Sequence, residues 1–222
     1  MWAYASEATL QHTYDFTLKT LADGVPGAVV ECGVGAGANL AVMSKAVREA
    51  GSAAQVYGFD SFDGIPIATE KDGCQPGLGF FTGKNPFFGG KDGNLESSGV
   101  TVHDLDSVRK RMDGFGFPGT ILRKGWFEES LADNSADIEE VAVLRMDCDL
   151  YAGTMVCMEA FYDKLAPTAL VIIDDYLLNG CRDAVHEFLD ARGAAWKIEQ
   201  IDLVAYVWNA GSPCTDCGPV AR

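Results

Sequence analysis

The chain has few basic residues and no long apolar run. Its 222 residues include 17 Lys and Arg against 32 Asp and Glu, which gives a formal net charge of −15. Nucleic-acid backbones and anionic membrane surfaces would be repelled by that charge, so neither is an expected partner. No segment approaches the roughly 18 apolar residues that span a bilayer, and no secretory signal pattern opens the sequence. We therefore expect a soluble, cytoplasmic protein.

A disulfide framework is also lacking. The seven cysteines are odd in number and spread through apolar segments, which predicts that most are reduced and structural. Cys214 and Cys217 have the spacing of half a zinc site, but no second pair accompanies them. A zinc site is therefore not favoured, and the tail at 210–222 has no predicted role.

What the chain does have is a repeated alternation of apolar runs and amphipathic segments. Repeated βα units of this kind form a parallel sheet covered by helices. Strands are predicted at 28–32, 55–60, 120–123, 141–146, 169–173, 196–201 and 204–208, and helices at 6–22, 38–50, 102–112, 127–131, 151–165 and 182–192. Only a short turn separates the last two strands, so that pair is expected to be antiparallel. The prediction is a single α/β domain over 1–222, Rossmann-like, with a mostly parallel seven-stranded sheet and helices on both faces.

The alternation stops between residues 61 and 99. A stretch this long without predicted elements is usually either disordered or functional, and its five phenylalanines argue against disorder. We predict a substrate lid at 61–99, with an ordinary surface insertion as the alternative. The lead-in helix within 1–26 is a second candidate for covering the site.

A glycine-rich loop follows the first predicted strand. Gly33, Gly35 and Gly37 allow a tight turn and a close approach of ligand to backbone, but their spacing differs from the dinucleotide fingerprint. Glu31 would repel a pyrophosphate but could pair with the ammonium of an amino-acid moiety. Asp60, which ends the second strand, is placed to accept hydrogen bonds from a ribose diol. These features favour S-adenosylmethionine, and a glycine-rich turn beside a surface acid is the alternative.

Acidic residues follow the fourth and fifth predicted strands. Asp147 and Asp149 come after the former, and Asp174 and Asp175 after the latter. Because ligands bind at the carboxyl ends of parallel strands, these side chains should share an edge with the glycine loop. Carboxylates brought together repel one another, and Mg²⁺ with oxygen ligands relieves that repulsion. In the alternative interpretation, Asp174 and Asp175 only cap the next helix, and Asp147 or Asp149 pairs with Arg145 or with a distant basic residue.

Five ordered blocks resemble the macrocin O-methyltransferase family over about residues 28–208. They are Glu31-x-Gly33-Val34-x-x-Gly37, Phe59-Asp60-Ser61-Phe62-x-Gly64-Ile65-Pro66, Lys124-Gly125-Trp126-Phe127, Leu144-Arg145-Met146-Asp147-x-Asp149-x-Tyr151 and Val171-Ile172-Ile173-Asp174-Asp175-Tyr176. The resemblance implies a Mg²⁺-dependent O-methyltransferase that acts on a hydroxyl, typically on a sugar of a natural product.

The resemblance also implies roles for individual residues. By position, the cofactor ligands would be Glu31, Gly33, Asp60, Ser61, Gly125 and Trp126, and the metal ligands Asp147, Asp174 and Asp175. Catechol methyltransferases use a lysine three residues after the first acid, where this chain has Leu150. That departure leaves an aspartate as the base: Asp147 is the hypothesis and Asp149 the runner-up.

Other functions remain open. A metal-dependent methyltransferase of a phenolic or other small metabolite is the main alternative, followed by a non-catalytic S-adenosylmethionine-binding protein and a nicotinamide oxidoreductase. The expected partner is a small hydroxylated acceptor. Apolar residues at the amino terminus and in the loop at 77–90 suggest a homo-oligomer.

Overall fold

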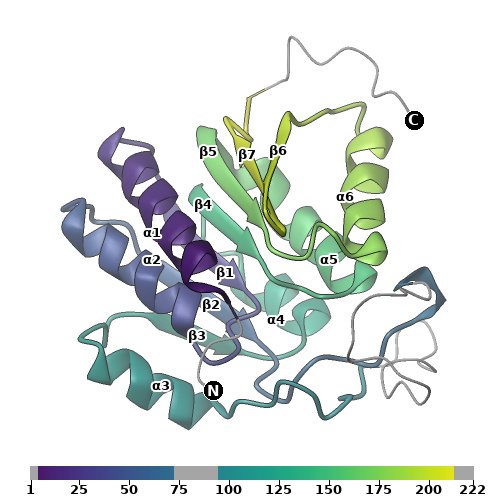
Figure 1. Ribbon diagram of the computed structural model, residues 1–222, viewed down its shortest axis with the longest axis horizontal. Helices are drawn as coiled ribbons and strands as arrows, with labels where there is room; N and C mark the ends of the chain where they lie inside the picture. The colour runs from purple at the N-terminus through teal and green to yellow at the C-terminus, as the bar shows by residue number, and fades with distance from the viewer. Residues whose placement is uncertain (1–4, 73–94, 213–222) are drawn as a thin grey trace.

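A computed structural model describes residues 5–72 and 95–212. Its centre is a sheet of seven strands in the order β3-β2-β1-β4-β5-β7-β6 (Figure 1). The strands are β1 (Ala28–Cys32), β2 (Val56–Asp60), β3 (Ile121–Lys124), β4 (Val141–Met146), β5 (Leu165–Ile173), β6 (Ile198–Ile201) and β7 (Val204–Trp208). All pairs from β3 to β5 are parallel, whereas β7 runs antiparallel to both β5 and β6. The predicted sheet and its terminal antiparallel pair are confirmed.

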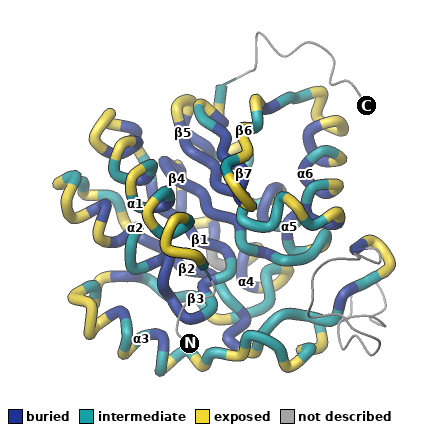
Figure 2. The backbone as a smooth tube through the Cα atoms, in the orientation of Figure 1, coloured by how far each residue is buried: buried dark blue, intermediate teal, exposed yellow. Residues whose placement is uncertain are grey.

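Helices cover both faces of this sheet (Figure 1). They are α1 (Glu7–Ala22), α2 (Ala38–Glu49), α3 (Leu105–Gly114), α4 (Phe127–Asn134), α5 (Tyr151–Phe161) and α6 (Asn179–Ala191), with 3-10 turns η1 (Glu70–Asp72) and η2 (Tyr162–Lys164). Helices α1 and α2 pack side by side on one face, and α5 and α6 pack together on the other. Strands β1 and β4 are buried along their whole length (Figure 2), which explains why their sequences are apolar except for Glu31 and Arg145.

The largest difference from the predicted elements is at the start of β5. The helix predicted to reach residue 165 ends at Phe161, and β5 begins at Leu165 rather than 169. Its pairing with β4 is irregular, since Val141 pairs with Leu165 but Val143 pairs with Leu170. Pro167 lies within this irregularity, where the proline nitrogen need not donate to a ladder. The proline obscured the early part of the strand in the sequence pattern.

Only the two ends of the stretch at 61–99 belong to the described structure. They form a short antiparallel contact, in which the nitrogen of Ile65 donates to the oxygen of Val100 at 3.0 Å and Pro66 pairs with Ser97. Residues 73–94 lie outside the described part, as do 1–4 and 213–222, so the lid, the apolar loop at 77–90 and the Cys214–Cys217 tail remain predictions. Four cysteines in the described part, at 32, 148, 157 and 181, are buried and free. Within the same residues, no helix has the length and apolar character of a membrane span.

Candidate active site

The glycine loop is held against the neighbouring strands by its backbone. The nitrogen of Gly33 donates to the carbonyl of Phe59 at 2.8 Å, and Gly33 has a φ of 90°. A Cβ at Gly33 would lie 1.8 Å from the carbonyl oxygen of Asp147, so only glycine fits there. Gly37 caps α2 with a φ of 92°. The loop therefore reaches the chain just after β4, as the strand-end argument predicted.

Asp60 anchors the same loop from the end of β2. One carboxylate oxygen, Oδ2, accepts hydrogen bonds from the nitrogens of Val34 and Gly35 at 2.8 and 2.9 Å. The other, Oδ1, accepts from the nitrogen of Phe62 at 2.7 Å. Burial raises the pKa of Asp60, and the three backbone donors oppose that rise. Asp60 thus orders the glycine loop, a role in addition to the predicted contact with a ribose.

The other three predicted cofactor residues lie beside Asp60. The nitrogen of Gly125 donates to the carbonyl of Asp60 at 3.0 Å, and Trp126 is the N-cap residue of α4. The hydroxyl of Ser61 forms local hydrogen bonds within the turn at residues 61–64. It donates to the carbonyl of Gly64 at 2.8 Å and accepts from the nitrogen of Asp63 at 3.1 Å. The structure therefore brings Gly33, Asp60 and Gly125 to one edge, while the hydroxyl of Ser61 is engaged locally.

Glu31 is buried and faces an arginine. Its side chain is 1% exposed, and its Oε1 accepts a hydrogen bond from Nη1 of Arg145 at 3.0 Å. The other oxygen, Oε2, is buried and has no protein partner. Burial raises the pKa of Glu31 well above its usual value, although Arg145 opposes the rise. A cationic group beside Oε2 would satisfy this acceptor, which fits the predicted ammonium.

Arg145 also contacts two of the predicted metal ligands. Its Nη1 donates to Oδ2 of Asp147 at 2.7 Å, and its Nη2 donates to Oδ1 of Asp174. The alternative in which Asp147 pairs with Arg145 is therefore correct as a contact. Capping of α6 is not the role of Asp175, because its Oδ2 accepts from the nitrogen of Asp149 at 2.8 Å.

Three carboxylates converge beside this arginine. Oxygens of Asp147, Asp149 and Asp175 lie within 4.8 Å of one another, whereas Asp174 is turned toward Arg145. Asp149 adopts a φ of 59°, a conformation that costs a non-glycine residue free energy and that places its carboxylate in the group. The structure thus brings Asp149, the runner-up base, into a set with two of the three predicted metal ligands.

Three acidic residues in and beside this group, Asp174, Asp149 and Asp175, have raised pKa values. Burial raises the pKa of Asp174 to about 6, with Arg145 opposing the rise. The pKa values of Asp149 and Asp175 are raised well above the usual value, first by burial and then by neighbouring carboxylates. An added cation at this position would relieve both effects.

The residue between Asp147 and Asp149 points to the other face, as strand alternation predicts. The sulfur of Cys148 lies 3.5 Å from that of Cys157 on α5. Burial raises the pKa of Cys148 to about 11, so this thiol stays protonated at neutral pH. Cys148 is therefore a packing residue rather than a metal ligand.

One positioning residue had no signal in the sequence. Asp72 is 7% exposed, and its Oδ1 accepts from the nitrogen of Tyr151 at 2.7 Å, in the first turn of α5. Its Oδ2 accepts from the nitrogen of Thr69 at 2.8 Å. Asp72 therefore ties the segment before residue 73 to the helix that follows Asp147 and Asp149.

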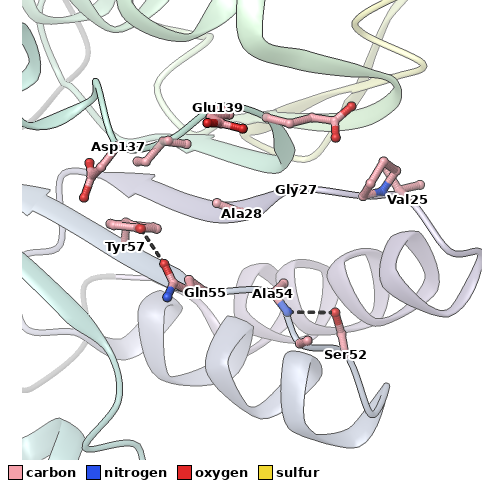
Figure 3. A pocket seen from close by; sticks show the side chains of 13 residues that line it. Val25, Gly27, Ala28, Ser52, Ala54, Gln55, Tyr57, Asp137 and Glu139 are labelled. Atoms are coloured by element: carbon pink, nitrogen blue, oxygen red, sulfur yellow. Dashed lines mark hydrogen bonds between the residues drawn. The ribbon is translucent and has the colours of Figure 1, made fainter.

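A separate open pocket lies at the opposite edge of the sheet, at the amino ends of β1 and β2 (Figure 3). Its volume is about 490 Å³, and its walls include Gly27, Gln55, Tyr57 and Asp137. The hydroxyl of Tyr57 donates to Oε1 of Gln55 at 2.6 Å on one of its walls. Because ligands of open α/β sheets bind at the carboxyl ends of strands, this pocket is not the candidate site.

Solved structures support the fold. The O-methyltransferase NovP is 26% identical and superposes with a TM-score of 0.72, over 90% of this chain and 78% of that one. A calicheamicin methyltransferase, CalS11, is 19% identical, with a TM-score of 0.70 over 91% of this chain and 80% of that one. These likenesses confirm the class I methyltransferase fold.

Sequence comparisons identify the family. The profile of the macrocin-O-methyltransferase (TylF) family matches residues 3–84 and 88–210. A tetracenomycin rhamnosyl 4'-O-methyltransferase of Streptomyces olivaceus is 34% identical over 193 residues, covering 85% of this chain and 68% of the relative. The mycinamicin III 3''-O-methyltransferase of Micromonospora griseorubida is 32% identical over 207 residues, covering 90% of this chain and 74% of the relative. The chain therefore belongs to the macrocin-O-methyltransferase family and is an S-adenosylmethionine-dependent O-methyltransferase.

Proposed function

We propose that this enzyme transfers a methyl group to a hydroxyl of a sugar on a natural product, assisted by Mg²⁺. The observation that carries the proposal is the convergence of Asp147, Asp149 and Asp175 within 4.8 Å, directly beside the glycine loop. The two relatives above are named for methylation of a rhamnosyl-tetracenomycin in one case and of mycinamicin III in the other. A sugar hydroxyl is a weak nucleophile, so its methylation needs a general base to accept its proton, and a carboxylate can do this.

The donor set fits a hard divalent cation. All three ligating atoms are carboxylate oxygens, which suit Mg²⁺ and do not suit softer metals. The raised pKa values of Asp149 and Asp175 indicate a deficit of positive charge that a divalent ion would fill. Asp147, Asp149 and Asp175 would hold the ion, and Asp174 would join them if its carboxylate turned from Arg145. When bound, Mg²⁺ supplies a Lewis acid that lowers the pKa of a chelated hydroxyl.

Two aspartates are candidates for the base. Asp147 is engaged by Arg145, whose Nη1 donates a hydrogen bond to its Oδ2 at 2.7 Å. Asp149 has no ion pair with Arg145 among the described contacts, so its carboxylate is the better placed of the two to accept a proton. We therefore assign proton removal from the acceptor hydroxyl to Asp149 and orientation of the acceptor to Asp147. Glu31 and the glycine loop hold the methyl donor in line with that hydroxyl.

The test is a methyl-transfer assay with an L-rhamnosylated aglycone that carries free vicinal hydroxyls. We expect chelation by EDTA to abolish turnover and Mg²⁺ to restore it. At saturating Mg²⁺, Asp149→Asn should lower kcat by about 10²–10⁴-fold, as loss of a general base does. Asp163→Asn is the matched control, because Asp163 is exposed and pairs only with Arg192 among the described ion pairs.

Three results would contradict the proposal. Full turnover in EDTA would exclude the metal, and full turnover of Asp149→Asn at saturating Mg²⁺ would exclude Asp149 as base. Methylation of a catechol with no methylation of the rhamnoside would replace the sugar acceptor by a phenolic one.

A further inference from the structure

A fully buried arginine lies under the predicted cofactor site. Arg145 on β4 has 0% exposure, and among the described residues it is the only Lys or Arg in the buried core. It is in register with Glu31 on β1 and with Ile172 on β5, so their side chains emerge on the same face of the sheet. That face is the one covered by α2, because a Cβ at Gly58, the register partner of Glu31, would meet Leu40.

The contacts of Arg145 divide between two parts of the site. Nη1 donates both to Glu31 Oε1 and to Asp147 Oδ2, and Nη2 donates to Asp174 Oδ1. Only a planar guanidinium presents several donors in a fixed fork, whereas a lysine ammonium is a point charge. The result is a Glu31 carboxylate fixed at one oxygen, with the other oxygen, Oε2, buried and unpartnered.

We propose that Arg145 is a positioning residue for the amino group of the cofactor: it holds Glu31 at Oε1 so that Oε2 is presented to the ammonium of the methionine moiety. The unpartnered Oε2 supports this assignment, because an acceptor buried without a donor costs free energy that a bound ammonium recovers. Without Arg145, the Glu31 carboxylate would have no counter-charge among the described ion pairs and no fixed orientation. Loss of Arg145 would therefore weaken the contact with the amino group of the ligand and leave the other contacts of the pocket in place.

Binding measurements with two ligands separate this role from general support of the fold. S-adenosylhomocysteine has the amino group, and its desamino analogue lacks only that group. By isothermal titration without metal or acceptor, we expect Arg145→Met to weaken binding of S-adenosylhomocysteine at least about tenfold, and of the desamino analogue less than about threefold. Glu31→Gln should weaken binding of the same ligand and spare the analogue in the same way. The double variant of Arg145→Met and Glu31→Gln should lose little more affinity for S-adenosylhomocysteine than either single variant.

Two further variants complete the experiment. Arg192→Met is the matched control, because Arg192 forms its ion pair with Asp163 at the surface and should leave both affinities unchanged. If Arg145→Met does not fold, Arg145→Lys carries the test, since lysine retains the charge but loses the fork. Arg145→Lys should weaken the binding of S-adenosylhomocysteine at least about threefold and leave the affinity for the desamino analogue unchanged.

Equal losses for the two ligands, or no loss, would overturn the proposal and leave Arg145 as a structural ion pair. Because the titration needs neither metal nor acceptor, its outcome is independent of the metal-assisted sugar methylation proposed above.

Discussion

At the scale of single residues, the glycines of one loop have different physical requirements. Gly33 has a φ of 90° and faces the carbonyl oxygen of Asp147, where a Cβ would lie at 1.8 Å. Gly35 has a φ of 50°, and a Cβ there would meet nothing within 4 Å. The sequence shows three equivalent glycines, but only the first is required by contact with the segment that carries the acidic residues.

The two positions predict different costs for alanine. Gly33→Ala should lower the free energy of unfolding by more than about 3 kcal/mol, because backbone strain adds to a clash with another strand end. Gly35→Ala should lower the free energy of unfolding by about 1–2 kcal/mol, since only the left-handed backbone conformation is unfavourable for alanine there. Urea unfolding of the ligand-free protein measures both. Equal losses in the two variants would show that the approach to Asp147 does not constrain the loop.

At the scale of elements, α5 is fixed at its first turn by a residue from a distant segment. Its N-cap residue, Leu150, provides no side-chain cap, and Asp72 accepts the hydrogen bond from Tyr151 instead. Gly180 on α6 permits the contact, because a Cβ there would lie 2.6 Å from Oδ1 of Asp72. The segment at 61–72, α5 and α6 are thus joined around one carboxylate.

Removal of this carboxylate should affect both stability and turnover. Asp72→Ala should lower the free energy of unfolding by about 1–2 kcal/mol, as loss of an N-cap acceptor does. It should also lower kcat by about tenfold or more, because the residues before α5 carry Asp147 and Asp149 and small displacements there slow the reaction. Urea unfolding and methyl-transfer assays measure the two effects.

The matched control is Ile138→Val. Ile138 is 2% exposed and lines the pocket at the opposite edge of the sheet. Its truncation should lower the free energy of unfolding by a similar amount, about 0.5–1.5 kcal/mol, and leave kcat unchanged. If Ile138→Val reduced kcat as much as Asp72→Ala, the effect of Asp72 would be one of stability alone.

At the scale of the whole molecule, negative charge is concentrated inside as well as outside. The formal net charge is −15, and several acidic groups of the site have raised pKa values, including Asp174 at about 6. A carboxyl whose pKa is higher in the folded state than the usual value near 3.9 stabilises the fold while protonated. That contribution is present at low pH and is lost as pH rises through the folded pKa.

The ligand-free protein should therefore become less stable between about pH 5 and about pH 7. Thermal unfolding in EDTA at constant ionic strength measures this dependence. Asp174→Asn should reduce the slope, whereas Asp163→Asn should leave it unchanged. Added Mg²⁺ should raise the melting temperature more at the higher pH, because it binds ionised carboxylates. A wild-type stability that rises over the same interval would contradict the assignment of buried, charge-deficient carboxyls.

The order of the elements and the positions of the main site residues along the chain could be predicted from the sequence alone. The order of strands and helices, the glycine loop after β1 and the acids after β4 and β5 follow from local patterns, because buried parallel strands require apolar runs and strand ends carry the ligands. The antiparallel end of the sheet followed from a turn too short for a crossover. Cys148 was placed on the opposite face by alternation alone.

Tertiary structure decided the partners of the charged groups. Glu31 and Arg145 are far apart in sequence, and only strand register brings them together beneath the predicted cofactor site. Asp149 has a positive φ, its backbone nitrogen donates to Asp175, and its carboxylate lies with those of Asp147 and Asp175, whereas Asp174 pairs with Arg145. Such contacts depend on distances between separate strands and on which carboxylates compete for the buried guanidinium of Arg145. Neither can be predicted from the residue pattern along a single strand.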